Sequence, residues 1–186
     1  MTEKAIWDYL LNKLHNTKGV AAMMGNLMAE SSMNPKCVTG IKKTGMTVDE
    51  YIKASDEGKH DFVNDSVTFG LVQWCFKTRK EGLLNKAKSC NSSVADTLTQ
   101  LQYLLDELPK YKTAYNAVIN GTDIAEITKT VMLKYEKPGN TGEAAQQKRI
   151  NYAKSYYNRY ASDNISVRCS HNVWEAFYAS LQSEFE

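Results

Sequence analysis

The 186-residue chain has few of the features that mark membrane, fibrous or disordered proteins. Its longest unbroken apolar run, at residues 20–24, has five residues, whereas a membrane-spanning helix needs about 20. Only three residues are proline and 42% are apolar, which excludes collagen-like and disordered chains. We therefore expect one compact domain with a substantial core and no insertion into a membrane.

The chain also lacks an excess of charge of either sign. It has 23 Lys and Arg residues against 21 Asp and Glu residues, which gives no field strong enough to predict a nucleic-acid partner. Glu3, Lys4 and Asp8 stand among the first residues, so the chain does not open with the basic and apolar segments of a signal peptide. We expect no binding of nucleic acid and, if the protein acts outside a cell, delivery by another route.

Cysteine is scarce and scattered. The four cysteines form no C-x-x-C pair: Cys37, Cys75, Cys90 and Cys169. We expect them to be reduced and structural. Cys169 and His171 are close in sequence, but a zinc site needs about four ligands and the other two histidines show no matching spacing. The sequence therefore predicts no metal site and no cofactor.

Helical periodicity dominates what the chain does contain. Apolar residues recur at three- and four-residue steps from Trp7 to Leu14, which is typical of an amphipathic helix. The same reasoning predicts further helices at residues 20–31, 47–57, 78–88, 93–108, 111–119, 123–135, 142–160 and 172–183.

Caps and breaks support this pattern. Thr47, with a glutamate three residues later, has the sequence of a capping box, and Ser93 and Asp123 are expected N-caps. Outside the capped helix, residues 35–74 are rich in Gly, Thr, Lys and Asp. We expect a loop-rich face there, with strands only in residues 61–71.

Glu30 is the most informative residue for function. The helix at residues 20–31 is apolar on every face, which predicts that it is buried, and Glu30 continues the stripe of Met23 and Leu27 at its C-terminal end. Burial and the negative end of the helix dipole both disfavour a charged carboxylate. Glu30 is therefore expected to hold a proton and to be able to serve as a general acid. The simpler alternative is a surface glutamate that closes a helix.

Several short motifs resemble those of a known enzyme superfamily. E-S at residues 30–31, N-P at 34–35 and F-G-L-V-Q-W at 69–74 resemble the E-S and G-L-x-Q motifs of goose-type lysozymes and lytic transglycosylases. The fuller pattern is similar to the phage tail lysozyme family over residues 3–160: M-G-N at 24–26, A-E-S at 29–31, G-L-V-Q-W at 70–74, Arg79, Tyr135-Glu136 with Pro138, and INYAKSYYNRY.

This resemblance implies a mainly α, lysozyme-like fold with a buried central helix that ends in the catalytic glutamate and a small loop-rich or β-rich lobe. Residues 1–160 would form the catalytic domain and residues 161–186 a C-terminal helical extension, whose packing the sequence leaves open. Glu30 would donate a proton to the glycosidic oxygen between N-acetylmuramic acid and N-acetylglucosamine in the glycan strands of peptidoglycan. The protein would work in a phage tail, a tail-like particle or an endolysin, with other tail proteins or cell-wall-binding modules as partners.

Four further residues fall in the motifs as expected substrate contacts, and each has a structural alternative. Gly70 would allow close approach of a sugar or simply form a turn. Gln73 offers an amide to an N-acetyl group or to a loop. Trp74 could stack on a sugar face, and Tyr135 could line the cleft, but both could equally lie in the core.

A hydrolase needs a second carboxylate, about 5 Å from the acid if retaining and about 6.5–9.5 Å away if inverting. Asp61 and Asp65 are the expected candidates, because they lie in the loop-rich stretch among polar residues. Glu136 is a further possibility. Glu50 and Asp56 belong to the expected solvated face of a helix.

Three alternatives to hydrolysis follow from the same residues. A lytic transglycosylase would need only Glu30, because the 6-hydroxyl of the substrate attacks and forms a 1,6-anhydro end. A non-catalytic cell-wall-binding module would have no reason to place a carboxyl group on an apolar stripe. A cysteine peptidase or amidase would have to pair a cysteine with a histidine, and Cys75 and His60 are the candidates.

Overall fold

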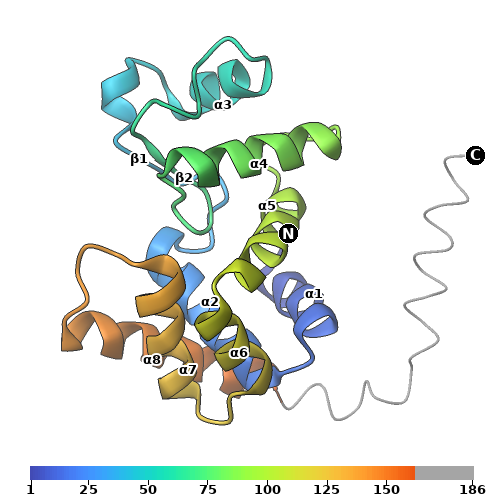
Figure 1. The fold of residues 1–186 in the computed structure, drawn as a ribbon, viewed down its shortest axis with the longest axis vertical. Helices are drawn as coiled ribbons and strands as arrows, with labels where there is room; N and C mark the ends of the chain where they lie inside the picture. Colours follow the sequence, from blue (N-terminus) through green and yellow to red (C-terminus); the bar gives the residue numbers. More distant parts are fainter. Residues whose placement is uncertain (162–186) are drawn as a thin grey trace, which may run out of the picture.

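The computed structural model describes residues 1–161, which form a mainly helical fold, as predicted (Figure 1). The α-helices within this part are α1 (Glu3–Leu14), α2 (Thr17–Ser31), α3 (Val48–Asp56), α4 (Lys77–Ser89), α5 (Thr97–Glu107), α6 (Lys112–Asn120), α7 (Ile124–Val131) and α8 (Glu143–Tyr160). The other elements are β1 (Val38–Thr39), β2 (Thr68–Phe69), the 3-10 helices η1 (Ile41–Thr44) and η2 (Leu108–Lys110), and the π-helical turn η3 (Met132–Glu136). The helix expected at residues 172–183 lies outside the described residues. No helix in residues 1–161 combines the length and apolar character needed to cross a bilayer.

Helix α2 is the centre of the fold and packs against α1, α6, α7 and α8. Its apolar run at residues 20–24 is fully buried, as the sequence predicted. Gly25 allows α8 to come close, because a Cβ atom there would lie 2.7 Å from the carbonyl oxygen of Arg149. The helix ends where Ser32 and Met33 adopt left-handed conformations, with φ of 53° and 60°.

The segment between α2 and α4 forms a small lobe around a two-stranded antiparallel sheet. Strand β2 lies within the expected window, but β1 falls outside it, so the prediction of strands only at residues 61–71 was wrong. Val38 pairs with Phe69 and Thr39 with Thr68. Two-residue strands are too short to show a period, and their pairing depends on contacts distant in sequence. Figure 1 shows this lobe with α3 at one end of the molecule and α6, α7 and α8 at the other.

Most predicted helix ends agree with the structure. Thr47 and Glu50 form the capping box of α3, and Asp123 caps α7. Ser93 is not an N-cap: α5 begins later, and Asp96 caps it by accepting from a backbone N–H. The hydroxyl of Ser93 instead accepts a hydrogen bond within the preceding turn. The helix expected at residues 123–135 is also shorter, because the chain changes to the π-helical turn η3 after α7.

Candidate active site

Glu30 lies in the last turn of α2, and its side chain is 15% exposed, so the expected partial burial is confirmed. Its Oε1 atom accepts a hydrogen bond from Nη2 of Arg149 at 2.7 Å. Glu30 is therefore not the isolated acid that the sequence predicted, because a guanidinium group holds its carboxyl group in place.

Sequence reasoning missed Arg149, although a signal was present. Arg149 lies on the buried face of α8 together with Ile150, Ala153 and Tyr156. A charged residue on an apolar stripe was the observation that singled out Glu30, and it applies equally to this cation. The side chain of Arg149 is 8% exposed, and its Nη1 atom also donates to the carbonyl oxygen of Asn26 in α2 at 3.4 Å.

Glu136 places a second carboxyl group near this pair. It ends the π-helical turn η3, and neither of its two carboxyl oxygens is exposed or hydrogen-bonded to the described part of the chain. Burial raises the pKa of Glu136 well above its ordinary value, and the negative charge of Glu30 raises it further. Both effects favour the neutral, protonated form of this carboxyl group.

Glu107 in α5 joins several of the expected site residues from inside the core. Its carboxylate accepts two hydrogen bonds from Arg79, each 2.7 Å long, and further ones from Trp74 Nε1, Tyr103 Oη and Tyr135 Oη. Trp74 is 0% exposed and Tyr135 is 1% exposed. These contacts favour the structural alternative for both aromatic residues, since neither ring presents a face to a ligand.

Gly70 and Gln73 hold the turn after β2 in place. The Gln73 amide donates to the carbonyl oxygens of Cys37 and Gly70 and accepts from the hydroxyls of Thr39 and Thr68. Gly70 has φ of 79°, and a Cβ atom there would come within 2.7 Å of a neighbouring glutamine side chain. The close approach expected at Gly70 is thus made by the protein itself, and the amide of Gln73 is fully used inside the loop.

Replacing Tyr135 by Phe tests which role the buried aromatic cluster has. We expect the free energy of unfolding to fall by about 1–3 kcal/mol, because Glu107 loses a buried hydrogen-bond donor. Activity per folded molecule should be unchanged. Tyr115→Phe is the matched control, since no hydrogen bond of its hydroxyl joins it to the described residues. Thermal melts and turbidity assays measure both quantities, and lower activity at unchanged stability would restore the substrate-contact hypothesis.

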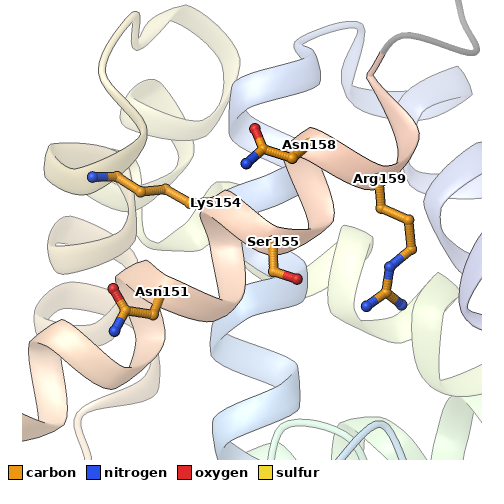
Figure 2. Close-up of a pocket in the computed structure, with 5 residues that line it drawn as sticks. All are labelled: Asn151, Lys154, Ser155, Asn158 and Arg159. Atoms are coloured by element: carbon orange, nitrogen blue, oxygen red, sulfur yellow. The ribbon is translucent and has the colours of Figure 1, made fainter.

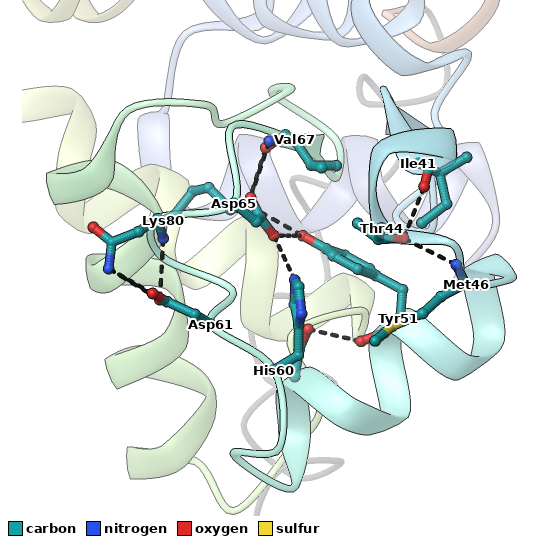
Figure 3. Close-up of polar contacts among 11 residues, drawn as sticks. Ile41, Thr44, Met46, Tyr51, His60, Asp61, Asp65, Val67 and Lys80 are labelled. Carbon is teal, nitrogen blue, oxygen red and sulfur yellow. Dashed lines mark hydrogen bonds and ion pairs between the residues drawn. The ribbon is translucent and has the colours of Figure 1, made fainter.

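Asp61 and Asp65 lie together in the loop before β2 but in different surroundings (Figure 3). Asp65 is buried and accepts from Tyr51 Oη, His60 Nε2, the backbone N–H of residue 67 and the ammonium group of Lys80. Burial opposes its ionisation, but the hydrogen bonds outweigh this effect and lower the pKa of Asp65. Asp61 is exposed, and hydrogen bonds from Asn64 lower its pKa. Within residues 1–161 neither aspartate shares a hydrogen bond or ion pair with Glu30.

The cysteines give no support to a peptidase. Cys37, Cys75 and Cys90 are free, as expected. Cys75 is exposed, so the structural role expected of the cysteines was wrong for this one. His60 is engaged by Asp65 at 3.0 Å rather than held against a thiol.

Two hollows on the surface of residues 1–161 differ in character. One, of about 380 Å³, adjoins the Glu30–Arg149 pair and is lined by Ala29, Pro138, Asn140, Ala144, Ala145, Lys148 and Arg149. The other, of about 550 Å³, lies along the outer face of α8 (Figure 2) and is lined by Asn151, Lys154, Ser155, Asn158 and Arg159. Neither described lining includes a carboxyl group, but Arg149 in the lining of the smaller hollow is paired with Glu30 at the end of α2. The smaller hollow is therefore the better candidate for the catalytic site.

The comparison with protein families decides the identity. A family model described as phage tail lysozyme matches residues 1–160. The chain belongs to the phage tail lysozyme family. No curated protein matches the chain. Family membership indicates a lysozyme-like enzyme that acts on peptidoglycan and is associated with the phage tail, and it confirms the predicted fold class.

Proposed function

We propose that this phage tail lysozyme cleaves glycan strands between N-acetylmuramic acid and N-acetylglucosamine, with Glu30 as the general acid. The proposal is carried by the position of Glu30: a partly buried carboxyl group at the end of the central helix, where a hollow of about 380 Å³ reaches the neighbouring Ala29 and Arg149. A sugar bound there would lie beside Arg149, which lines the hollow and is paired with Glu30.

The ion pair between Glu30 and Arg149 suits the state of the acid after it has given up its proton. When Glu30 gives its proton to the leaving oxygen, a carboxylate is produced in a partly buried place, where an unpaired charge is costly. Nη2 of Arg149, at 2.7 Å, already holds that carboxylate. Arg149 therefore stabilises the product form of the acid and fixes the direction of its side chain.

Two reactions are possible, hydrolysis and lytic transglycosylation, and they differ in the group that attacks the sugar cation. In hydrolysis a water molecule attacks, and Asp61 or Asp65 would stabilise the cation or activate the water. One observation favours the second candidate function, a lytic transglycosylase that needs Glu30 alone: the oxygens of Asp65 are already occupied by four protein donors.

Mass spectrometry of the muropeptides released from purified cell walls distinguishes the two reactions. Hydrolysis produces reducing N-acetylmuramic acid ends, and it predicts that Asp61→Asn or Asp65→Asn lowers the rate at least about a hundredfold. Rates must be taken per folded molecule, because Asp65 is buried against Lys80. Products with 1,6-anhydro ends, together with two active Asn variants, would identify a lytic transglycosylase.

The biological setting follows from the same proposal. An enzyme of this kind in a tail or a tail-like particle would open the wall ahead of the particle, and as an endolysin it would reach the wall at lysis. In either setting its substrate is the glycan strand, and its protein partners would be other tail components or cell-wall-binding modules.

A further inference from the structure

The carboxyl group of Glu136 is a buried polar group without a partner. Both of its oxygens are inaccessible to solvent and lack a hydrogen bond to the described residues. Most buried polar side-chain atoms in proteins are hydrogen-bonded, so an exception calls for an explanation. The π-helical turn that ends at Glu136 places it there, and such turns are common at functional sites.

The groups that act on Glu136 come from four other elements and form two ion pairs. Arg79 of α4 pairs with Glu107 of α5, and Arg149 of α8 pairs with Glu30 of α2. Each pair is neutral as a unit, so an ionised Glu136 would leave one uncompensated negative charge in the interior. If Glu30 were protonated instead, Arg149 would be free to compensate that charge. Nε of Arg149 is buried and has no acceptor among the described residues.

We propose that Glu30 and Glu136 form a coupled pair that retains one proton at neutral pH, with Glu136 holding the proton while Glu30 is paired with Arg149. This inference rests on the proposed function, in which Glu30 is the proton donor. It makes Glu136 a positioning residue that acts through Glu30. It also explains how a carboxylate held by a guanidinium group can still supply an acid.

The reaction returns every proton that it uses. The proton leaves the carboxyl group of Glu136 and reaches Glu30; because the two carboxyl groups are not hydrogen-bonded to each other, the transfer requires a side-chain rotation that brings an oxygen of Glu136 within hydrogen-bond distance of Glu30. Glu30 passes it to the glycosidic oxygen, which takes both electrons of the breaking carbon–oxygen bond. The attacking water, or the 6-hydroxyl of the sugar, forms the new bond and releases one proton, which restores the pair.

Glu136→Gln tests the pair, because the amide has the shape of the neutral acid but cannot hold a titrating proton. In the natural enzyme the last proton of the pair is lost at raised pH, because burial and the negative charge of Glu30 both raise the pKa of Glu136. In the variant, Glu30 is the only member of the pair that can hold a proton, and it lies beside Arg149 without a neighbouring anion. We expect the alkaline limb of the kcat/KM profile to move down by at least about one pH unit, with about a tenfold loss at neutral pH that is recovered in acid.

A stability measurement gives a second readout that does not use activity. A folded-state pKa raised above the unfolded value means that the natural protein loses stability as pH rises between those two values. Glu136→Gln removes this loss, so the Tm of the variant minus that of the natural protein should increase steadily from about pH 5 to pH 8. Glu81→Gln, an exposed change on α4, is the matched control and should shift neither the limb nor the Tm difference.

The outcomes separate this inference from the proposed function. A uniform loss of activity at every pH with an unmoved alkaline limb, or a Tm difference independent of pH, would show that Glu136 is merely structural. If Glu30→Gln remained active, the proposed function would fail, whereas the pH dependence of the Tm difference would still report whether Glu136 holds a proton.

Discussion

Glu30→Gln is expected to lower peptidoglycan cleavage by more than about 10⁴-fold, beyond the 10²–10⁴ range of groups that only assist proton transfer. The reason is that the amide cannot give a proton to the leaving oxygen, and none of the described residues that line the hollow beside α2 carries a carboxyl group that could replace it. Turbidity clearance and muropeptide release measure the loss.

The fold should survive this change. Gln keeps an oxygen that can accept from Nη2 of Arg149, while the charge on the acceptor is lost. The expected cost is about 1–3 kcal/mol of unfolding free energy, the range for a hydrogen bond to a charged group. Glu81→Gln again serves as the matched control, because it makes the same chemical change on an exposed surface.

If a folded Glu30→Gln protein cleared the turbidity of cell walls at nearly the natural rate, the proposed mechanism would be wrong. Retained binding to cell walls without cleavage by the natural protein would instead point to a non-catalytic wall-binding module. Indifference of the natural enzyme to iodoacetamide is expected as well, since the proposed chemistry uses no thiol.

The sequence predicted the parts of the fold that depend on local patterns. The buried helix ending at Glu30, the capping box at Thr47 and the cap at Asp123 were all visible, because periodicity and capping are properties of neighbouring residues. Strand β1 and the cap at Asp96 were missed. Both depend on which of several competing contacts is made once the chain is folded.

The site was harder to predict because its charges meet across the fold. Glu30 and Arg149 are 119 residues apart in sequence, and Arg79 and Glu107 are 28 apart. No spacing rule connects such pairs. Motif positions were also a poor guide to roles, since Trp74 contributes a hydrogen bond to the core rather than an exposed ring.

Glu107→Gln is expected to give the largest loss of stability in the molecule. Glu107 and Arg79 have side chains only 3% and 10% exposed. Burial opposes ionisation of Glu107, but the hydrogen bonds from Arg79 and Trp74 outweigh it and lower the pKa of Glu107. Removing the charge leaves the Arg79 guanidinium buried without a counter-ion, which costs about 3–5 kcal/mol. At about 2–4 °C per kcal/mol, this cost corresponds to a fall in Tm of roughly 6–20 °C.

The loss should come from the unpaired guanidinium rather than from the missing carboxylate itself. A buried ion pair replaced on both sides by apolar groups is often neutral or stabilising. Arg79→Met combined with Glu107→Leu should therefore recover the part of the loss that comes from the unpaired guanidinium, while the loss of an acceptor for Trp74, Tyr103 and Tyr135 remains. Glu126→Gln provides the matched control, since its ion pair with Lys129 is exposed and contributes about 0–1 kcal/mol. Equal effects of Glu107→Gln and Glu126→Gln in thermal melts would contradict the claim that Glu107 anchors the core. If the double variant were also well folded but inactive, the cluster would have to support the Glu30–Glu136 pair as well as the fold, because Arg79 and Glu107 both act on Glu136 electrostatically.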